Sequence, residues 1–208
     1  MTPNSYNTIE KPSVAEYKDR GSKFIAYAFP ITDVNEFKEK LATIKKEHPK
    51  ATHHCFAYRI GLNGSNLPAG QAGYRVGDDG EPSGTAGRPI LGQIDSKQLT
   101  NALIIVVRYF GGTLLGAPGL INAYKTAASL ALQLTPSIKK QVLLNYRLQF
   151  DYTRMNDVMK IVKQFDCIIL QQEMQLFSSL QIGIAKKSLA EVLSGLKELP
   201  GVEAEVAE

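Results

Sequence analysis

Hydrophobic residues in the first part of the chain follow two periods, one typical of helices and one typical of strands. Val34, Phe37, Leu41 and Ile44 fall on one face of a helix expected to reach from 34 to about 47. Two further helices are expected, one that starts near 83–85 and runs toward 94, and one over about 117–132. The pattern predicts an α+β unit in which helices back a sheet. Its extended segments are expected at 13–18, 23–31, 53–60 and 102–109.

The pattern changes after Pro136, and we expect a domain boundary there. The apolar run that starts at Leu130 should end as a helix before this proline, which disfavours helix in the preceding residue. The two domains are then 1–136 and 137–208. Of the 17 glycines, 13 lie between Gly61 and Gly119, so loops are concentrated in the first domain, with a long one over 61–80.

The second domain alternates strands and helices in the order βαββαβ. This order predicts a ferredoxin-like fold, in which right-handed crossovers place both helices on one face of an antiparallel sheet. Thr153 is expected to cap the first helix. The helical stripes are Val158, Ile161, Val162 and Phe165, then Leu189, Val192, Leu193 and Leu196. The strands are expected at 142–150, 167–170, 176–184 and 202–206.

Composition excludes several classes of protein. No apolar run approaches the roughly 20 residues of a membrane-spanning helix, and residues 1–11 lack the pattern of a secretory signal, so we expect a cytoplasmic protein. Cys55 and Cys167 lie far apart and are expected to be reduced thiols in strands, with no metal site and no cofactor. The net charge of +4 belongs entirely to residues 1–137, which favours an anionic partner, although an ordinary solvated surface explains it as well.

The first candidate site is an acidic, glycine-rich run that leads into an expected helix. The run reads Asp78-Asp79-Gly80-Glu81-Pro82-Ser83-Gly84-Thr85-Ala86-Gly87-Arg88-Pro89. Its carboxylates and hydroxyls could cap the helix, whose first N–H groups lack partners. Alternatively, the N–H groups around Gly84, Thr85 and Gly87 could bind a phosphate with help from Arg88. The carboxylates would repel that phosphate unless a metal bridged them, and the run is not a Walker loop.

The second candidate site follows the strand expected at 102–109. Gly111, Gly112 and Thr113 stand between this strand and a helix, where anions often bind. The glycine spacing is not that of a dinucleotide-binding fold. Arg108 either reaches a phosphate or forms an ion pair with an acidic residue of the first run, which would lock the two loops together.

The third candidate site is the strand expected at 53–60. His53, Cys55, Ala57 and Arg59 should share one face of it. His53 with the carboxylates of the first run could form an acid–base or metal site, although a histidine is more often simply hydrogen-bonded inside a sheet. Aromatic residues near arginines favour single-stranded RNA, but could also belong to the core. These aromatic residues are Tyr58, Tyr74, Tyr109 and Phe110, near Arg59, Arg75 and Arg108.

The three runs together resemble the IMPACT/YigZ family. The matching segments are 23–26, 51–59, 78–91 and 107–113, in the order of the family. The resemblance implies an N-terminal domain similar to the second domain of ribosomal protein S5. It also implies a C-terminal ferredoxin-like domain similar to late domains of elongation factor G. Eukaryotic members resemble translational regulators that bind the activator of an initiation-factor kinase. Family members usually carry basic residues where this chain has Leu114 and Asn122.

The sequence therefore predicts a translation-associated regulator that binds RNA, the ribosome or a translation-regulatory protein. The alternative is a hydrolase-like enzyme that acts on a phosphorylated or peptide-like substrate through His53, Asp78, Asp79 and Glu81. A third hypothesis is a protein-interaction module that uses the sheet of the second domain. The residues expected to contact RNA or another anion are Arg59, Arg88, Arg108, Lys125, Gly84, Thr85, Gly87, Gly111, Gly112 and Thr113.

Overall fold

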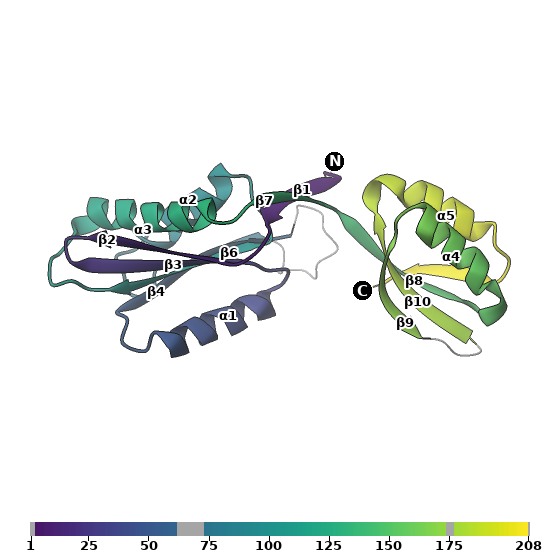
Figure 1. The fold of residues 1–208 in the computed structure, drawn as a ribbon, viewed down its shortest axis with the longest axis horizontal. Helices are drawn as coiled ribbons and strands as arrows, with labels where there is room; N and C mark the ends of the chain where they lie inside the picture. The colour runs from purple at the N-terminus through teal and green to yellow at the C-terminus, as the bar shows by residue number, and fades with distance from the viewer. Residues whose placement is uncertain (1–2, 62–72, 174–176, 208) are drawn as a thin grey trace. The chain divides into compact units, whose positions relative to one another are not determined.

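The computed structural model describes residues 3–61, 73–173 and 177–207 (Figure 1). The chain divides into two compact units. The N-terminal unit runs from Tyr6 to Lys140, and the C-terminal unit joins Pro3–Ser5 to Gln141 and the residues that follow it. Among the described residues, no helix is both long enough and apolar enough to cross a membrane.

The N-terminal unit is built on a five-stranded sheet. The strand order is β2-β3-β6-β4-β5, and every neighbouring pair is antiparallel. The central strand β6 is buried on both faces, which explains its uninterrupted apolar sequence. The strands are β2 (Ser13–Asp19), β3 (Ser22–Pro30), β4 (His53–Ile60), β5 (Gly73–Gly77) and β6 (Ala102–Tyr109).

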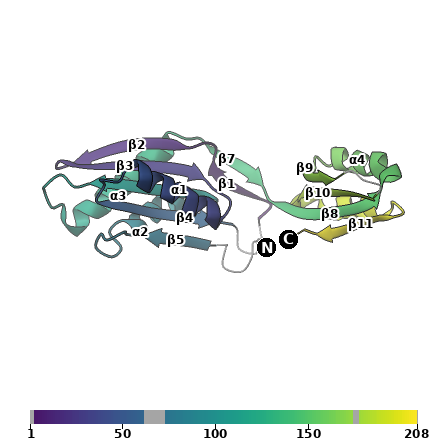
Figure 2. The same cartoon turned by 90° about the horizontal axis from the view of Figure 1, so that it is seen from below.

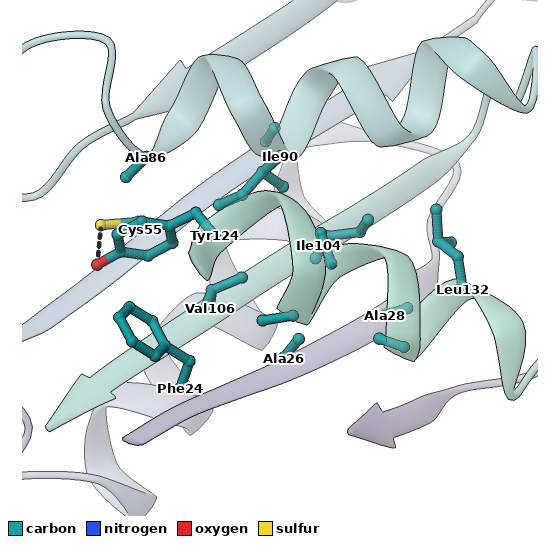
Figure 3. Packing of buried hydrophobic residues seen from close by; sticks show 14 of the residues in the cluster. Phe24, Ala26, Ala28, Cys55, Ala86, Ile90, Ile104, Val106, Tyr124 and Leu132 are labelled. Carbon is teal, nitrogen blue, oxygen red and sulfur yellow. Dashed lines mark hydrogen bonds between the residues drawn. The ribbon is translucent and has the colours of Figure 1, made fainter. Parts of the chain in front are cut away.

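Helices cover both faces of this sheet. The helices α2 (Gly87–Ser96) and α3 (Gly116–Gln133) lie on one face, and α1 (Val34–Glu47) lies on the other (Figures 1 and 2). Alternate residues of β6 therefore enter different apolar clusters. Ile104 and Val106 pack toward α2 and α3 (Figure 3), whereas Ile105 and Val107 pack toward α1. The expected α+β class is confirmed.

The start of α1 shows how local sequence sets a helix boundary. The Asp33 carboxylate accepts hydrogen bonds from the N–H groups of Asn35 and Glu36, which have no partner within the helix. Phe37 and Ile44 are the buried residues of the expected apolar stripe. The two lysines of the last turn stand where the helix dipole favours positive charge.

Three short strands were not expected from the sequence. β1 (Ser5–Ile9) and β7 (Ser137–Gln141) form a separate two-stranded sheet, and β5 lies inside the segment expected to be a loop. None of them shows a full apolar alternation. β5 and β7 are largely exposed, and the two buried residues of β1, Thr8 and Ile9, are adjacent in sequence. Residues 62–72 of the expected loop lie outside the described residues.

Two expected helix starts were wrong. The helix α2 begins at Gly87, because the residues before it form a turn in which the Glu81 N–H bonds to the Asp78 carbonyl. Thr153 does not cap α4 (Met155–Gln164). It lies in a short 3-10 turn over Tyr152–Arg154, and its own N–H donates to the Asp151 carboxylate.

The C-terminal unit has the expected βαββαβ order, and its ferredoxin-like fold is confirmed. Its antiparallel sheet has the strand order β11-β8-β10-β9. The helices α4 and α5 (Leu189–Lys197) cover one face (Figure 1). Leu148, Leu180 and Ile182 pack there against Val158 and Val192. The strands are β8 (Leu143–Asp151), β9 (Ile168–Glu173), β10 (Phe177–Ala185) and β11 (Val202–Val206).

Candidate functional site

The three runs singled out in the sequence meet in one place in the N-terminal unit. Strand β4 supplies His53 and Cys55, the loop before α2 supplies Asp78, Asp79 and Glu81, and the end of β6 supplies Arg108. Helix α3 adds Tyr124, whose hydroxyl reaches the same cluster. The fold therefore brings residues from four separate segments into one cluster.

Glu81 is the centre of the cluster and is almost fully buried. Its Oε1 accepts a hydrogen bond from Arg108 Nη1 at 2.6 Å and another from the Tyr124 hydroxyl at 2.7 Å. The ion pair is the second of the two roles considered for Arg108, and it joins the loop before α2 to the end of β6. Burial of a charge is costly unless it is paired, so each partner depends on the other.

Arg108 lies between aromatic rings rather than at the surface. It is only 5% exposed, and its guanidinium carbon is 5.5 Å from the centre of the Phe24 ring and 5.6 Å from that of Phe110. Its Nε has no hydrogen-bond partner among the described residues. The outer ring, Phe110, is about half exposed and covers the guanidinium.

Asp78 holds the start of α2. One carboxylate oxygen accepts from the N–H groups of Ala86 and Gly87, and the other accepts from that of Gly84. These are among the N–H groups that could have met a phosphate, and here an internal carboxylate occupies them. The Thr85 hydroxyl is likewise engaged, since it donates to the Pro82 carbonyl. The helix-cap interpretation of this run describes the observed geometry.

Asp79 ties the same loop to β4 and α1. Its carboxylate accepts from the His54 N–H at 2.7 Å and lies 3.3 Å from Lys45 Nζ. Its carbonyl lies 2.7 Å from His53 Nδ1, which must therefore carry the proton, because a carbonyl only accepts. His53 Nε2 then faces Glu81 Oε1 at 3.8 Å. Burial lowers the pKa of neighbouring His54.

Cys55 is fully buried, and its side chain lies beside that of Tyr124 (Figure 3). Its sulfur lies 3.0 Å from the Asp78 carbonyl and 3.3 Å from the Tyr124 hydroxyl. Burial raises the pKa of the Cys55 thiol and that of Tyr124 well above their ordinary values. A nucleophilic cysteine needs a lowered pKa and access, so Cys55 has the properties of a structural thiol.

Two of the glycines expected to contact an anion have a packing role. A side chain at Gly87 would lie 2.9 Å from Val76 Cβ and 3.0 Å from the Gly77 nitrogen, so glycine lets α2 approach β5. A side chain at Gly111 would overlap the Gly21 backbone at 1.9 Å. The Gly111 N–H also donates to the Ser22 hydroxyl. Gly112 and Thr113 remain exposed in the same loop.

The remaining expected cations differ in their surroundings. Arg59 forms two hydrogen bonds to Asp95 of α2 and lies 5.4 Å from the centre of the Tyr74 ring. Arg88 and Lys125 are exposed on the outer sides of α2 and α3. The two positions that lack the basic residues usual in the family, Leu114 and Asn122, are exposed as well, Leu114 at 82%.

The three carboxylates named in the hydrolase alternative are all engaged by donors of the protein. Asp78, Asp79 and Glu81 point to three different sets of protein donors, instead of converging on a common space. Within the part of the chain that the structure describes, no group of three or more His, Cys, Asp or Glu side chains could hold a metal ion. The observed contacts of these carboxylates connect the loop before α2 with α2, β4 and β6.

Sequence reasoning missed Tyr124 and Lys45 as members of this site. Tyr124 follows the apolar stripe of α3, in which Leu120, Ala123 and Ala127 are also buried, and this stripe shows only that it faces the sheet. A hydroxyl inside such a stripe needs a partner, which is the one signal that could have identified it. Lys45 gave no comparable signal.

Comparison with known proteins places the chain in a family. Residues 20–132 match the family model described as the Impact N-terminal domain. A protein named IMPACT family member from Haemophilus influenzae is 36% identical over 185 residues, which cover 89% of this chain and 87% of that protein. IMPACT family member YigZ from Escherichia coli is 33% identical over 177 residues, with coverages of 85% and 84%.

A solved structure described as a hypothetical protein extends this similarity to both units. It covers 99% of this chain and 98% of its own, with a TM-score of 0.75 and 29% sequence identity. The match to the family domain spans the loop before α2, the strand β4 and the Tyr124 cluster. The chain thus belongs to the IMPACT family.

Proposed function

We propose that the N-terminal unit binds single-stranded RNA, free or within a ribosome, and that the protein acts as a translation-associated regulator. The observation that carries the proposal is the charge left on α2 and α3. The charged side chains of these helices are Arg88, Lys125 and Asp95, and Asp95 is bound to Arg59. Neither Arg88 nor Lys125 forms an ion pair with a described residue, so the outer side of the helices favours a polyanion.

The acidic loop before α2 does not oppose this binding. Asp78 is bound by three backbone N–H groups, Glu81 by Arg108, and Asp79 by Lys45 and the His54 N–H. Each negative charge is therefore balanced locally by a donor of the protein. The repulsion of a phosphate, which the sequence alone suggests, is reduced without any bridging metal.

Tyr74 supplies a surface for stacking. It is 61% exposed on the edge strand β5, and the Arg59 guanidinium lies against its ring. Stacking of a base on an exposed aromatic ring, together with arginine, is the usual means of binding single-stranded nucleic acid without strong sequence preference. The translational setting rests on family membership, since the resemblance implies regulators of translation.

The proposal is tested by titrating the full chain into a fluorescent single-stranded RNA at several salt concentrations. Removing two phosphate contacts with R88A/K125A should reduce the slope of log K against log salt by about 1.4, at about 0.7 per contact. Tyr74→Ala should weaken binding by about 1–3 kcal/mol, the range for one stacked base. Fluorescence anisotropy measures both effects.

The matched control is K163A/K197A, which removes two exposed lysines from the helices α4 and α5 of the C-terminal unit. This control should leave the slope unchanged. Absence of RNA binding at low salt, or equal losses in the control and the test variant, would contradict the proposal. Retained binding of a translation-regulatory protein in that case would assign the function to a protein partner instead.

A further inference from the structure

The face of the C-terminal sheet that α4 and α5 leave uncovered has polar side chains arranged in rows. Paired residues on antiparallel strands point to the same face, so the register defines each row. One row contains Glu203, Gln149, Ser179 and Glu173 from β11, β8, β10 and β9. The next row contains Glu205, Arg147, Gln181 and Gln171 in the same strand order.

The charge of this face is opposite to that of α2 and α3. Among the described residues of these rows and their ends, Asp151, Glu173, Glu203 and Glu205 carry four carboxylates, against one cation, Arg147. The Thr153 N–H lowers the pKa of Asp151, so that this carboxylate stays ionised. A phosphate backbone would be repelled here, whereas a cationic group would be attracted.

A hollow of about 550 Å³ lies at one end of this face. Phe177, Asp151 and Glu203 line it, together with Gln149 and Ser179. A second hollow of about 320 Å³ shares Gln149 and Ser179 and adds Arg147, Gln171, Glu173 and Gln181. The two hollows therefore adjoin and run across the sheet toward its β9 edge.

The exposed side chain of Phe177 points to a ligand, in addition to the negative charge around the hollow. It is 78% exposed and stands opposite Asp151 in the register of β10 and β8. An aromatic ring beside two carboxylates and an amide is suited to a guanidinium, which stacks on the ring and donates paired hydrogen bonds to a carboxylate. An ammonium group is a point charge and uses this arrangement less completely.

We propose that this hollow binds an arginine side chain in an extended segment of a partner protein. The guanidinium lies on Phe177 and donates to Asp151 and Glu203, and the amides of Gln149 and Gln181 accept or donate along the segment. The edge strand β9 offers further apolar contact through Ile168 and Leu170, which are 50% and 47% exposed. This interaction is separate from RNA binding by the N-terminal unit, and one can fail without the other.

The test uses the full chain labelled with 15N and three short Gly/Ser peptides that carry two arginines, two lysines or two citrullines. Citrulline has the shape of arginine without its charge. The arginine peptide should shift the amide signals of Phe177, Ser179 and Glu203 in a saturable manner. The lysine peptide should bind about tenfold more weakly, because a point charge loses the paired hydrogen bonds. The citrulline peptide should cause no shift.

Two variants separate binding from folding. Glu203→Lys should abolish the saturable shifts, whereas Glu191→Lys makes the same charge change on the exposed surface of α5 and should leave them unchanged. Phe177→Ala should weaken binding of the arginine peptide until its affinity equals that of the lysine peptide. Equal binding of all three peptides, shifts outside this face, or the same shifts caused by single-stranded RNA or by self-association at high protein concentration, would each overturn the proposal.

Discussion

At the scale of single residues, the buried charges of the N-terminal unit depend on one another. Glu81 accepts hydrogen bonds from both Arg108 and Tyr124. Both Glu81 and Arg108 are buried, so water cannot replace either charged partner. The sequence indicated the Arg108 ion pair as one of two alternatives, because an arginine at a strand end and an acidic loop are both visible in it. Tyr124 could not be paired with Glu81 from the sequence, since 43 residues separate them.

Replacing Glu81 with glutamine tests this dependence. The substitution keeps the shape of the side chain but leaves the Arg108 charge buried without a counter-ion. The free energy of unfolding should fall by about 3–5 kcal/mol, as for other broken buried ion pairs. Urea denaturation followed by circular dichroism measures it, with the exposed Glu191→Gln as control. A loss no larger than that of the control would show that Arg108 does not need this carboxylate.

At the scale of elements, apolar periodicity predicted the long helices and central strands well. The bounds of β4 and β6 agree with the expected ones, because their residues are buried and their pattern is set by the core. β5 and β7 could not be predicted in this way, since most of their residues are exposed, and the two buried residues of β1 are too few to form a pattern. The helix α2 starts later than the expected 83–85. The carboxylate of Asp78 caps it at the N–H groups of Ala86 and Gly87, which are eight and nine residues further along the chain.

Alanine should change stability in opposite directions at two glycines, one where the β2–β3 turn approaches the end of β6 and one on the open side of α2. Gly111→Ala places a side chain into the Gly21 backbone, so stability should fall by about 1–3 kcal/mol, as for other overpacked sites. Gly92→Ala, on the exposed side of α2 with nothing within 4 Å, should instead raise stability by up to about 1 kcal/mol. Thermal unfolding of the two variants measures both. Equal changes would mean that the turn moves freely.

At the scale of the whole molecule, each unit has its own apolar core. The clusters on the two faces of the N-terminal sheet are built from residues of that unit, and Leu148, Leu180 and Val192 belong to a cluster of the C-terminal unit. The change of pattern near Pro136 predicted two domains, 1–136 and 137–208. It could not indicate that Pro3–Ser5 would group with the second unit, because that grouping depends on tertiary pairing.

Separate cores predict separate responses to core mutations. Leu148→Ala should cost about 2–5 kcal/mol in the stability of the C-terminal unit. Hydrogen exchange measured by mass spectrometry should then become faster in β8, β10 and β11. Protection of β3, β4 and β6 should stay unchanged. Ile105→Ala is the matched variant in the N-terminal unit, and it should make exchange faster in β3, β4 and β6 but not in β8, β10 and β11. Faster exchange throughout the chain in both variants would indicate a single cooperative unit.

The pairing of β1 with β7 has a consequence for the order of events during protein synthesis. Lys11 and Thr135, which bond to each other beside this pair, are 124 residues apart. At typical elongation rates, the first strand waits on the order of ten seconds for its partner to be made. The core strands and helices that lie between them are complete before then. The bridge of Asn7 to Leu99 can form earlier, because residue 99 is made before β7, so the pairing with β7 is the last contact that the first strand gains.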